Sequence, residues 1–224
     1  MNGPIALVGG DEFAPGCEFD AELIAEVSAT EILLLPTGSA YENPERLIAA
    51  AETWFAGLGV SVRTLPVYTR RDAFDADLLA AVASARMIYL AGASPMHLRS
   101  VLKDTPMFEA LHEAWRAGAA LIGTSAGADV LCDPMVDQRG GAYTVGLGLV
   151  PGVSVIPRSN TWSKEKVHRT VELSPAEVVV VELPERTAIL LDGSAGWRSS
   201  GVGEVVVHTA GGVGSLADIP EPVL

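Results

Sequence analysis

Cysteine and histidine are scarce in this sequence, and both shortages limit its chemistry. The 224 residues include only two cysteines, Cys17 and Cys132, and four histidines. Two cysteines are too few for a disulfide framework, and neither stands in a CxxC or Cys/His spacing typical of a metal site. We therefore expect neither a metal nor another cofactor, and we expect a reducing compartment.

Basic residues and long hydrophobic runs are scarce as well. Lys and Arg number 15 against 28 Asp and Glu, which gives a formal net charge of -13. Such a chain repels nucleic acid and anionic membrane surfaces. No apolar run reaches the ~18 residues that a membrane-spanning helix needs, and the first residues lack the basic region of a signal peptide. These features predict a cytoplasmic protein with neither nucleic acid nor membrane as a partner.

Hydrophobic residues, in contrast, make up 49% of the chain and occur in short runs separated by amphipathic segments. The runs predict buried strands at 4–8, 32–35, 60–65, 87–90 and 119–122. The amphipathic segments predict helices at 20–27, 43–58, 75–84, 96–102 and 107–116. This alternation is typical of an α/β fold with three layers, built on a doubly wound, mostly parallel sheet.

The pattern changes after Pro151. A helix is predicted at 164–171, followed by closely spaced apolar runs at 178–181, 188–191 and 205–208. Strands so close in sequence usually pair antiparallel, so we expect all three to extend the same sheet. We expect residues 1–211 to form one domain and residues 212–224 to be a poorly ordered C-terminal tail.

Four loops rich in small residues follow predicted strands. They are Gly9-Gly10-Asp11-Glu12, Pro36-Thr37-Gly38-Ser39, Gly92-Ala93-Ser94 and Gly123-Thr124-Ser125-Ala126-Gly127. In open α/β sheets, ligands bind outside the carboxyl ends of the strands. We therefore expect these four loops to meet at one edge of the sheet and to form the binding site.

The last of these loops has the GxSxG pattern between a strand and a helix. Gly123 and Gly127 leave room for the sharp, strained turn that lifts the Ser125 hydroxyl clear of the sheet. The same turn directs the Ala126 N–H and the start of the helix at the place where an oxyanion would form. The pattern predicts that Ser125 is a nucleophile, although a glycine-rich turn without catalysis has the same pattern.

The residues around this serine resemble a known family. Residues 121–128 resemble the Gly-x-Ser-Ala-Gly-Ala core of the cyanophycinase and aspartyl dipeptidase (peptidase E) family. Residues 32–39 resemble its early strand and small-residue loop, residues 146–152 its Gly-Leu-Gly-Leu-hydrophobic-Pro segment, and residues 182–188 its Asp-Glu-x-Thr-Ala hairpin. The four segments follow in the family's order, and the resemblance covers most of residues 4–208.

The resemblance implies a fold like that of the class I glutamine amidotransferases and the activity of a serine hydrolase. It implies cleavage next to acidic residues, either at the N-terminal aspartyl bond of dipeptides or at the β-aspartyl-arginine units of cyanophycin. The expected partner is thus a small peptide or an acidic amino acid. By analogy with the family's dimers, a homodimer is also expected.

Two departures from the family concern the catalytic groups. Where the family usually has Gly-Gly-Asn/Asp-Gln, this chain has Gly92-Ala93-Ser94-Pro95, so Gly92 and Ala93 remain candidates for the oxyanion loop through their backbone. The family's general-base histidine aligns with Arg158. Arginine stays protonated and cannot accept the serine proton, so the expected triad is broken.

Other groups are candidates for the missing roles. His97 follows the Gly92 loop and is the candidate base, while His112, His168 and His208 are expected to be structural or solvated. Asp137 lies where the peptidase E branch keeps its triad aspartate, and a solvated turn residue explains it equally well. Glu185, Asp11 and Glu12 are further acids near the expected site, with capping or turn roles as the alternative.

These residues support two functions. In the first, the chain is a serine-type peptidase or amidase that acts on aspartyl or β-aspartyl bonds through Ser125. In the second, it has lost activity and binds a small acidic or peptide ligand, with the Arg158 guanidinium holding a carboxylate. A nucleotide-binding module is disfavoured, because the first loop lacks GxGxxG and the chain has no Walker pattern.

Overall fold

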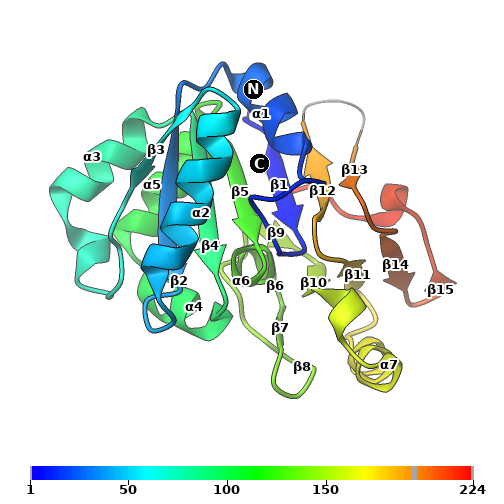
Figure 1. The fold of residues 1–224 in the computed structure, drawn as a ribbon. Coiled ribbons are helices and arrows are strands. Elements are labelled where there is room, and N and C mark those ends of the chain that lie inside the picture. The colour runs from blue at the N-terminus through cyan, green and yellow to red at the C-terminus, as the bar shows by residue number, and fades with distance from the viewer. Residues whose placement is uncertain (1, 193–195, 223–224) are drawn as a thin grey trace.

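A seven-stranded sheet forms the centre of the molecule in a computed structural model that describes residues 2–192 and 196–222 (Figure 1). Its order is β13-β12-β1-β5-β4-β2-β3. The strands span Ile5–Val8 (β1), Glu31–Gly38 (β2), Ser61–Thr64 (β3), Met87–Gly92 (β4), Ala120–Thr124 (β5), Thr187–Leu191 (β12) and Arg198–Gly201 (β13). The pairings from β1 through β5, β4 and β2 to β3 are parallel, and β12 and β13 extend the sheet antiparallel. The sequence predicts this extension for β12, but it predicts no strand at β13.

Helices cover both faces of this sheet and make it the middle of three layers. The helices span Phe19–Val27 (α1), Pro44–Gly57 (α2), Ala76–Ser84 (α3), Pro95–Leu102 (α4), Pro106–Arg116 (α5) and Ala126–Leu131 (α6). Because side chains alternate along a strand, Ala6 and Val8 pack with α1 and α2, while Ile5 and Leu7 share a core with the other four helices. The predicted doubly wound architecture is confirmed.

Local sequence signals set the starts of several helices. Asp75, Ser94 and Thr105 each accept hydrogen bonds from first-turn N–H groups of α3, α4 and α5 through their side chains. Proline begins both α4 and α5, where its missing N–H costs nothing. The predicted helix boundaries therefore agree with the structure to within one or two residues.

A second sheet packs beside the first, with the order β15-β14-β11-β10-β6-β9. Its strands span Cys132–Asp133 (β6), Val150–Pro151 (β9), Val153–Pro157 (β10), Val179–Leu183 (β11), Val206–Thr209 (β14) and Gly212–Val213 (β15). The remaining elements are Met135–Asp137 (β7), Ala142–Thr144 (β8), Lys164–Glu172 (α7), Asp72–Phe74 (η1), Ser159–Thr161 (η2) and Leu216–Asp218 (η3).

The second sheet corrects one prediction. Of the three late apolar runs, only the one that forms β12 joins the main sheet, whereas β11 and β14 lie in the second sheet. The reason is α7, which connects β10 to β11 as a crossover and so pairs them parallel. Once β11 lies beside β10, β14 pairs with β11 rather than with β12.

The C-terminal segment is also more ordered than predicted. β15 pairs with β14, Ile219 is buried, and the Trp197 indole N–H donates to the Pro220 carbonyl at 3.0 Å. The expectation of a poorly ordered tail is therefore wrong for the described residues up to 222. The division of the chain into one domain and a tail at residue 211 stays a prediction.

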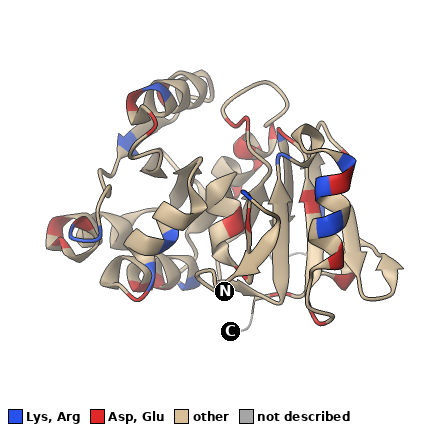
Figure 2. Ribbon diagram, turned by 90° about the horizontal axis from the view of Figure 1, so that it is seen from below, with Lys and Arg blue, Asp and Glu red and all other residues tan. Residues whose placement is uncertain are grey.

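Charge is spread over the outside of the molecule. In Figure 2, basic segments are few and alternate with acidic ones along the outer helices. None of the described helices is both long enough and apolar enough to span a bilayer. In the view of Figure 2, the Lys and Arg segments form no continuous stripe along the described chain.

Candidate active site

Ser125 stands at the turn between β5 and α6 with a strained backbone. Its φ is 51° and its ψ is −109°, a combination that a residue with a Cβ rarely adopts. The turn is held by the Ser125 N–H, which donates to the Val8 carbonyl at 2.9 Å. The predicted sharp turn at the serine is present.

The two glycines of the motif make this turn possible. A Cβ on Gly127 would lie 2.0 Å from the Leu90 carbonyl oxygen, and one on Gly123 would lie 2.5 Å from the Gly127 oxygen. Real Cβ atoms do not come so close to backbone atoms. Glycine is therefore required at both positions because α6 packs directly against β4 and β5.

The start of α6 lies beside the Ser125 hydroxyl. The first hydrogen bond within the helix runs from the Asp129 N–H to the Ser125 carbonyl at 3.1 Å. The N–H groups between Ser125 and Asp129, that of Ala126 included, come before this bond. The first N–H groups of any helix have no acceptor within the helix. Such N–H groups suit an oxyanion, and the donor role of Ala126 stays a prediction.

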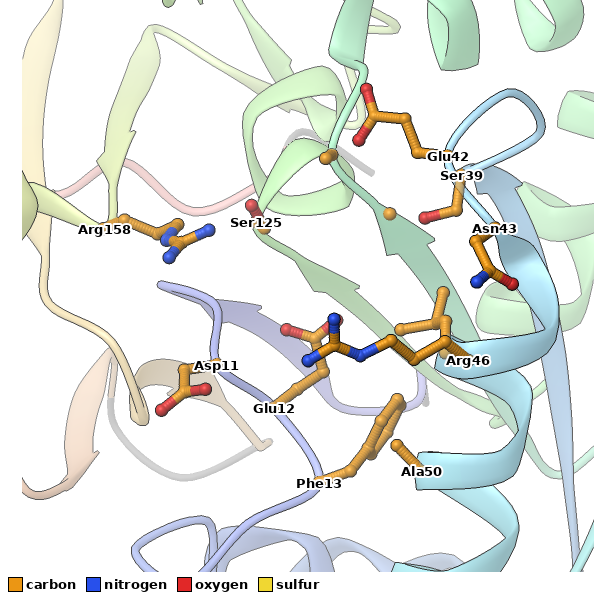
Figure 3. Close-up of a pocket in the computed structure, with 13 residues that line it drawn as sticks. Asp11, Glu12, Phe13, Ser39, Glu42, Asn43, Arg46, Ala50, Ser125 and Arg158 are labelled. Atoms are coloured by element: carbon orange, nitrogen blue, oxygen red, sulfur yellow. The ribbon is translucent and has the colours of Figure 1, made fainter.

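Ser125 opens into a cavity of about 370 Å³ at the carboxyl ends of the parallel strands (Figure 3). All four loops named in the sequence analysis contribute to it, so their predicted meeting at one edge is confirmed. Helix α2 and the residue before it close the opposite side with Asn43, Arg46, Leu47 and Ala50. The other lining residues are Asp11, Glu12, Phe13, Ser39, Glu42, Gly92, Ala93, Ser125 and Arg158.

The Gly92 loop is tightly held beneath this cavity. Gly92 has a φ of 125°, and a Cβ on it would lie 2.2 Å from the Gly38 carbonyl carbon. The N–H groups of Ala93 and Ser94 both donate to the Gly38 carbonyl, at 3.2 and 3.0 Å. The Ala93 N–H is therefore engaged within the loop, and an oxyanion would have to compete for it.

Arg158 reaches the same cavity from the end of β10. Its guanidinium extends toward Ser125 (Figure 3), and its Cγ would lie 3.0 Å from a Cβ on Gly10. Its Nε and Nη2 contact one Glu185 carboxylate oxygen at 2.9 and 2.7 Å, and Asn160 donates to the other at 3.2 Å. An ion-paired arginine fills the position where the sequence alignment expected a histidine.

The backbone of Arg158 is tied to the first loop. Its N–H donates to the Gly9 carbonyl at 2.8 Å, and the Arg186 N–H donates to the Gly10 carbonyl at 2.7 Å. The Gly9 N–H in turn donates to the Thr187 carbonyl at 2.8 Å. The first loop is thus fixed to β10 on one side and to β12 on the other.

His97 is not brought to Ser125. It lies in the first turn of α4, and its Nε2 lies 2.9 Å from the Tyr68 carbonyl oxygen, which can only accept a hydrogen bond. Its ring packs against Tyr41 with 4.9 Å between the ring centres. None of the described residues that line the Ser125 cavity is a histidine.

Asp137 lies in a neighbouring cavity of about 350 Å³, which shares Glu42 and Ala93 with the Ser125 cavity. Both of its carboxylate oxygens accept hydrogen bonds from the Arg139 guanidinium, at 2.9 and 2.6 Å. This contact keeps the pKa of Asp137 below its ordinary value. Asp137 is therefore engaged with a cation of its own turn.

The other three histidines have local partners. His112 stacks on Trp115 at 5.6 Å, His168 lies 3.3 Å from Glu172 on exposed α7, and His208 lies 2.7 Å from Glu182 in the second sheet. Each contact agrees with the structural or solvated roles expected for these residues.

Glu12 is one of the acids that the sequence placed near the expected site, but the sequence did not reveal its burial. It is partly buried, it lines the Ser125 cavity, and its Oε2 accepts a hydrogen bond from the Thr124 hydroxyl at 3.0 Å. Burial raises the pKa of Glu12 above its ordinary value. The only sequence signal was its place in a loop after a strand, which a turn residue shares. The α2 residues that line the cavity could not be recognised from the sequence, because the sequence there predicted only an amphipathic helix.

The fold and the site together define a three-layer α/β protein with a serine at a strand-to-helix elbow. The model of peptidase family S51 matches residues 9–196. The chain therefore belongs to peptidase family S51, the family that contains the cyanophycinase and peptidase E proteins. This membership supports a serine peptidase.

Curated relatives agree with this assignment. The cyanophycinase of Synechococcus elongatus is 24% identical over 216 residues, which cover 91% of this chain and 66% of the relative. The cyanophycinase of Trichormus variabilis is 26% identical over 162 residues, 67% of this chain and 54% of the relative. The chain thus spans about two thirds or less of the length of these relatives.

Solved structures confirm the fold. A peptidase from an acI-B1 actinobacterium superposes with a TM-score of 0.85 at 28% identity, covering 94% of this chain and 92% of that one. A putative peptidase E protein from Listeria monocytogenes gives a TM-score of 0.69 at 19% identity, covering 91% of this chain and all of that one. The class I glutamine amidotransferase-like fold that the resemblance implied is confirmed.

Proposed function

We propose that this chain is a serine-type peptidase or amidase in which Ser125 attacks the carbonyl of an aspartyl or β-aspartyl peptide bond. The observation that carries the proposal is the backbone of Ser125, with φ at 51° and ψ at −109° at the start of α6. Strain of this kind persists only where the surrounding structure enforces it, and it concentrates at functional sites.

The surroundings of Ser125 support an acyl transfer. The first N–H groups of α6 suit the negative oxygen of a tetrahedral intermediate, and Ala126 is the nearest donor. Gly92 and Ala93 also line the cavity. The cavity, at about 370 Å³, is large enough for a small peptide and falls within the usual size of ligand sites.

The charges of the cavity support a substrate with an acidic side chain. Arg46 and Arg158 both line it, and their guanidinium groups suit carboxylates. Arg158 already contacts Glu185, whereas Arg46 has no ion pair among the described residues. An acidic side chain of the substrate would give Arg46, which lies on α2, an ion-pair partner.

A fluorophosphonate probe tests the nucleophile. We expect the folded protein to be labelled at Ser125 and the Ser125→Ala variant to lose all labelling. A matched control is Ser159→Ala, which removes the hydroxyl of another buried serine outside the lining of the cavity. A wild-type protein that stays unlabelled while folded would overturn the proposal.

The second candidate is a family member without catalysis that binds a small acidic or peptide ligand. The observation in its favour is that an arginine, and no histidine among the described lining residues, faces Ser125. In that case acidic dipeptides at millimolar concentration raise the melting temperature while no hydrolysis occurs. Labelling of Ser125 together with dipeptide hydrolysis would decide for the enzyme.

A further inference from the structure

The Ser125 cavity contains a carboxyl group that neither the family resemblance nor the proposed function uses. We propose that Glu12 is the group that takes the proton from the Ser125 hydroxyl, in place of the histidine that this chain lacks at position 158. The inference rests on the proposed nucleophile and names the base that serves it.

The loop that carries Glu12 passes close to Ser125. A Cβ on Gly10, two residues before Glu12, would lie 3.3 Å from the Ser125 Cβ. Asp11 and Phe13 both have positive φ values, 53° and 62°, so the loop turns on either side of Glu12. The side chain of Glu12 is thereby placed against the end of β5, where Thr124 donates to it.

Glu12 and Ser125 face the same cavity (Figure 3). Thr124 precedes Ser125 directly, and its 3.0 Å bond to Glu12 holds the carboxylate at the end of β5. A carboxylate has about four lone-pair positions, so the bond from Thr124 leaves it able to accept another proton donor. A general base works within hydrogen-bond reach of its proton or through one water molecule, and the shared cavity has room for that water.

The charged groups around Glu12 act in opposite directions. Burial raises its pKa most, and the negative charge of Asp11 adds to this effect, whereas the positive charge of Arg158 opposes it. On its other side lie Cys17, Asp20 and Tyr89, whose pKa values are all raised, with the Glu12 charge among the causes.

The result is a carboxylate that accepts a proton more readily than an exposed glutamate does. A base works best when its pKa approaches the working pH, and a raised value moves Glu12 in that direction. The positive charge of Arg158 lowers the pKa of Glu12 and so stabilises its ionised form before the reaction.

The other carboxylates of the cavity are less suited to this role. Asp11 is exposed and lies 3.2 Å from Arg186, with which it pairs. Glu42 is exposed near the start of α2. Glu12 alone among the three has a hydrogen bond to the residue that precedes the nucleophile.

The proton balance of the reaction is simple. As the Ser125 oxygen bonds to the substrate carbonyl carbon, its proton passes to the Glu12 carboxylate. The protonated Glu12 then gives this proton to the leaving amine as the C–N bond breaks. Water attacks the acyl-enzyme, its proton passes to Glu12, and Glu12 returns it to the Ser125 oxygen as the acid product leaves.

The rate of fluorophosphonate labelling as a function of pH tests this role, because loss of fluoride from phosphorus needs the same activation of Ser125. We expect the wild-type rate to rise with pH over a range that lies above 4.5, the ordinary pKa of glutamate, and then to level off. Glu12→Gln should lower the rate at least about a hundredfold and remove this rise. Glu45→Gln makes the same charge change at an exposed position of α2 that does not line the cavity. It should leave the labelling rate and its rise with pH unchanged.

A second variant separates catalysis from structure. Glu12→Ala leaves space where formate can act as the missing carboxylate, so added formate should restore labelling in proportion to its concentration, while acetamide should not. A merely structural role for Glu12 would not respond to formate. Circular dichroism of each variant shows whether it is folded.

The outcomes separate the two proposals. Labelling of wild type that is equally fast at every pH from 4 to 9, or equal labelling of the folded wild type and Glu12→Gln, overturns the role of Glu12 and leaves Ser125 as the nucleophile. Absence of labelling in folded wild type at every pH overturns the proposed function, and the role of Glu12 with it.

Discussion

The two sides of the Ser125 cavity differ in how closely they follow the family. On the β5–α6 side, the elbow and its two close-packed glycines are all present. On the β10 side, the position aligned with the base carries Arg158, which is paired with Glu185. The elbow depends on backbone contacts that tolerate no substitution, whereas the base side depends on one side chain. A single replacement can therefore change the chemistry without disturbing the fold.

The elbow side should respond most strongly to substitution. Gly127→Ala brings a Cβ within 2.0 Å of the Leu90 carbonyl oxygen, so the start of α6 must move away from β4. We expect a loss of at least about 2 kcal/mol in the free energy of unfolding, together with the loss of Ser125 labelling. Urea unfolding measures the first effect.

Gly57→Ala at the end of α2 is the control, since nothing lies within 4 Å of the added Cβ. We expect this variant to be as stable as wild type or slightly more stable, because alanine favours the helix. Equal stability of Gly127→Ala and Gly57→Ala would show that the elbow is not held by close packing.

The base side should respond by changing activity rather than stability. Arg158→His places an imidazole on the side of the cavity that faces Ser125, and histidine tolerates the positive φ of 54° at this position. We expect labelling of Ser125 to rise by about tenfold, with a new pH limb near the histidine pKa of about 6.5. Arg158→Asn, which tolerates the same backbone but does not titrate there, should not show the limb.

A buried acid below the site should control the pH dependence of stability. Asp20 accepts a hydrogen bond from the Trp54 indole at 2.8 Å and contacts the Tyr89 hydroxyl, yet burial raises its pKa to about 7. A raised folded-state pKa means that the folded protein binds this proton more tightly than the unfolded chain does. The contribution to stability is therefore complete below the ordinary value of 3.8 and is lost as the pH rises through about 7.

Asp20→Asn removes this ionisation while keeping one acceptor for Trp54. We expect the melting temperature of wild type to fall from pH 5 to pH 8 by a few degrees more than that of the variant. Differential scanning calorimetry at several pH values measures the difference. Parallel curves for the two proteins would contradict the assignment of a buried, titrating Asp20.

The smallest effect is expected at the ion pair itself. The Arg158 side chain is 52% exposed, so the loss of its contact in Glu185→Gln should cost no more than about 1 kcal/mol. The same variant frees the Arg158 guanidinium for an acidic ligand, and we expect acidic dipeptides to raise the melting temperature more than they do in wild type. An unchanged ligand effect would show that Arg158 does not bind the substrate carboxylate.

The sequence predicted the main sheet, its helices and the elbow because each depends on local patterns. Apolar runs define β1 through β5, and Gly123 and Gly127 mark the turn at Ser125. It did not predict that β11 and β14 leave the main sheet, because that result depends on the path of α7 and not on the strands themselves.

The site was predicted in part for the same reason. The four loops lie together because the carboxyl ends of parallel strands lie at the same edge of the sheet, and the sequence pattern predicts that sheet. His97 and Asp137 lie close to the expected edge in sequence, but side-chain direction turns them to Tyr68 and Arg139. Glu12 could be recognised as a candidate base only when its burial and its hydrogen bond from Thr124 were known.

The bonds of the first loop have a mechanical consequence. Gly9 and Gly10 accept hydrogen bonds from Arg158 and Arg186, and these bonds join the first loop to β10 and to the turn before β12. A displacement of any one of these three segments would strain the other two, so this wall of the cavity moves as a unit. We therefore expect the proposed substrate to enter past the opposite side of the cavity, near the exposed side chains of Tyr41 and Glu42 before α2.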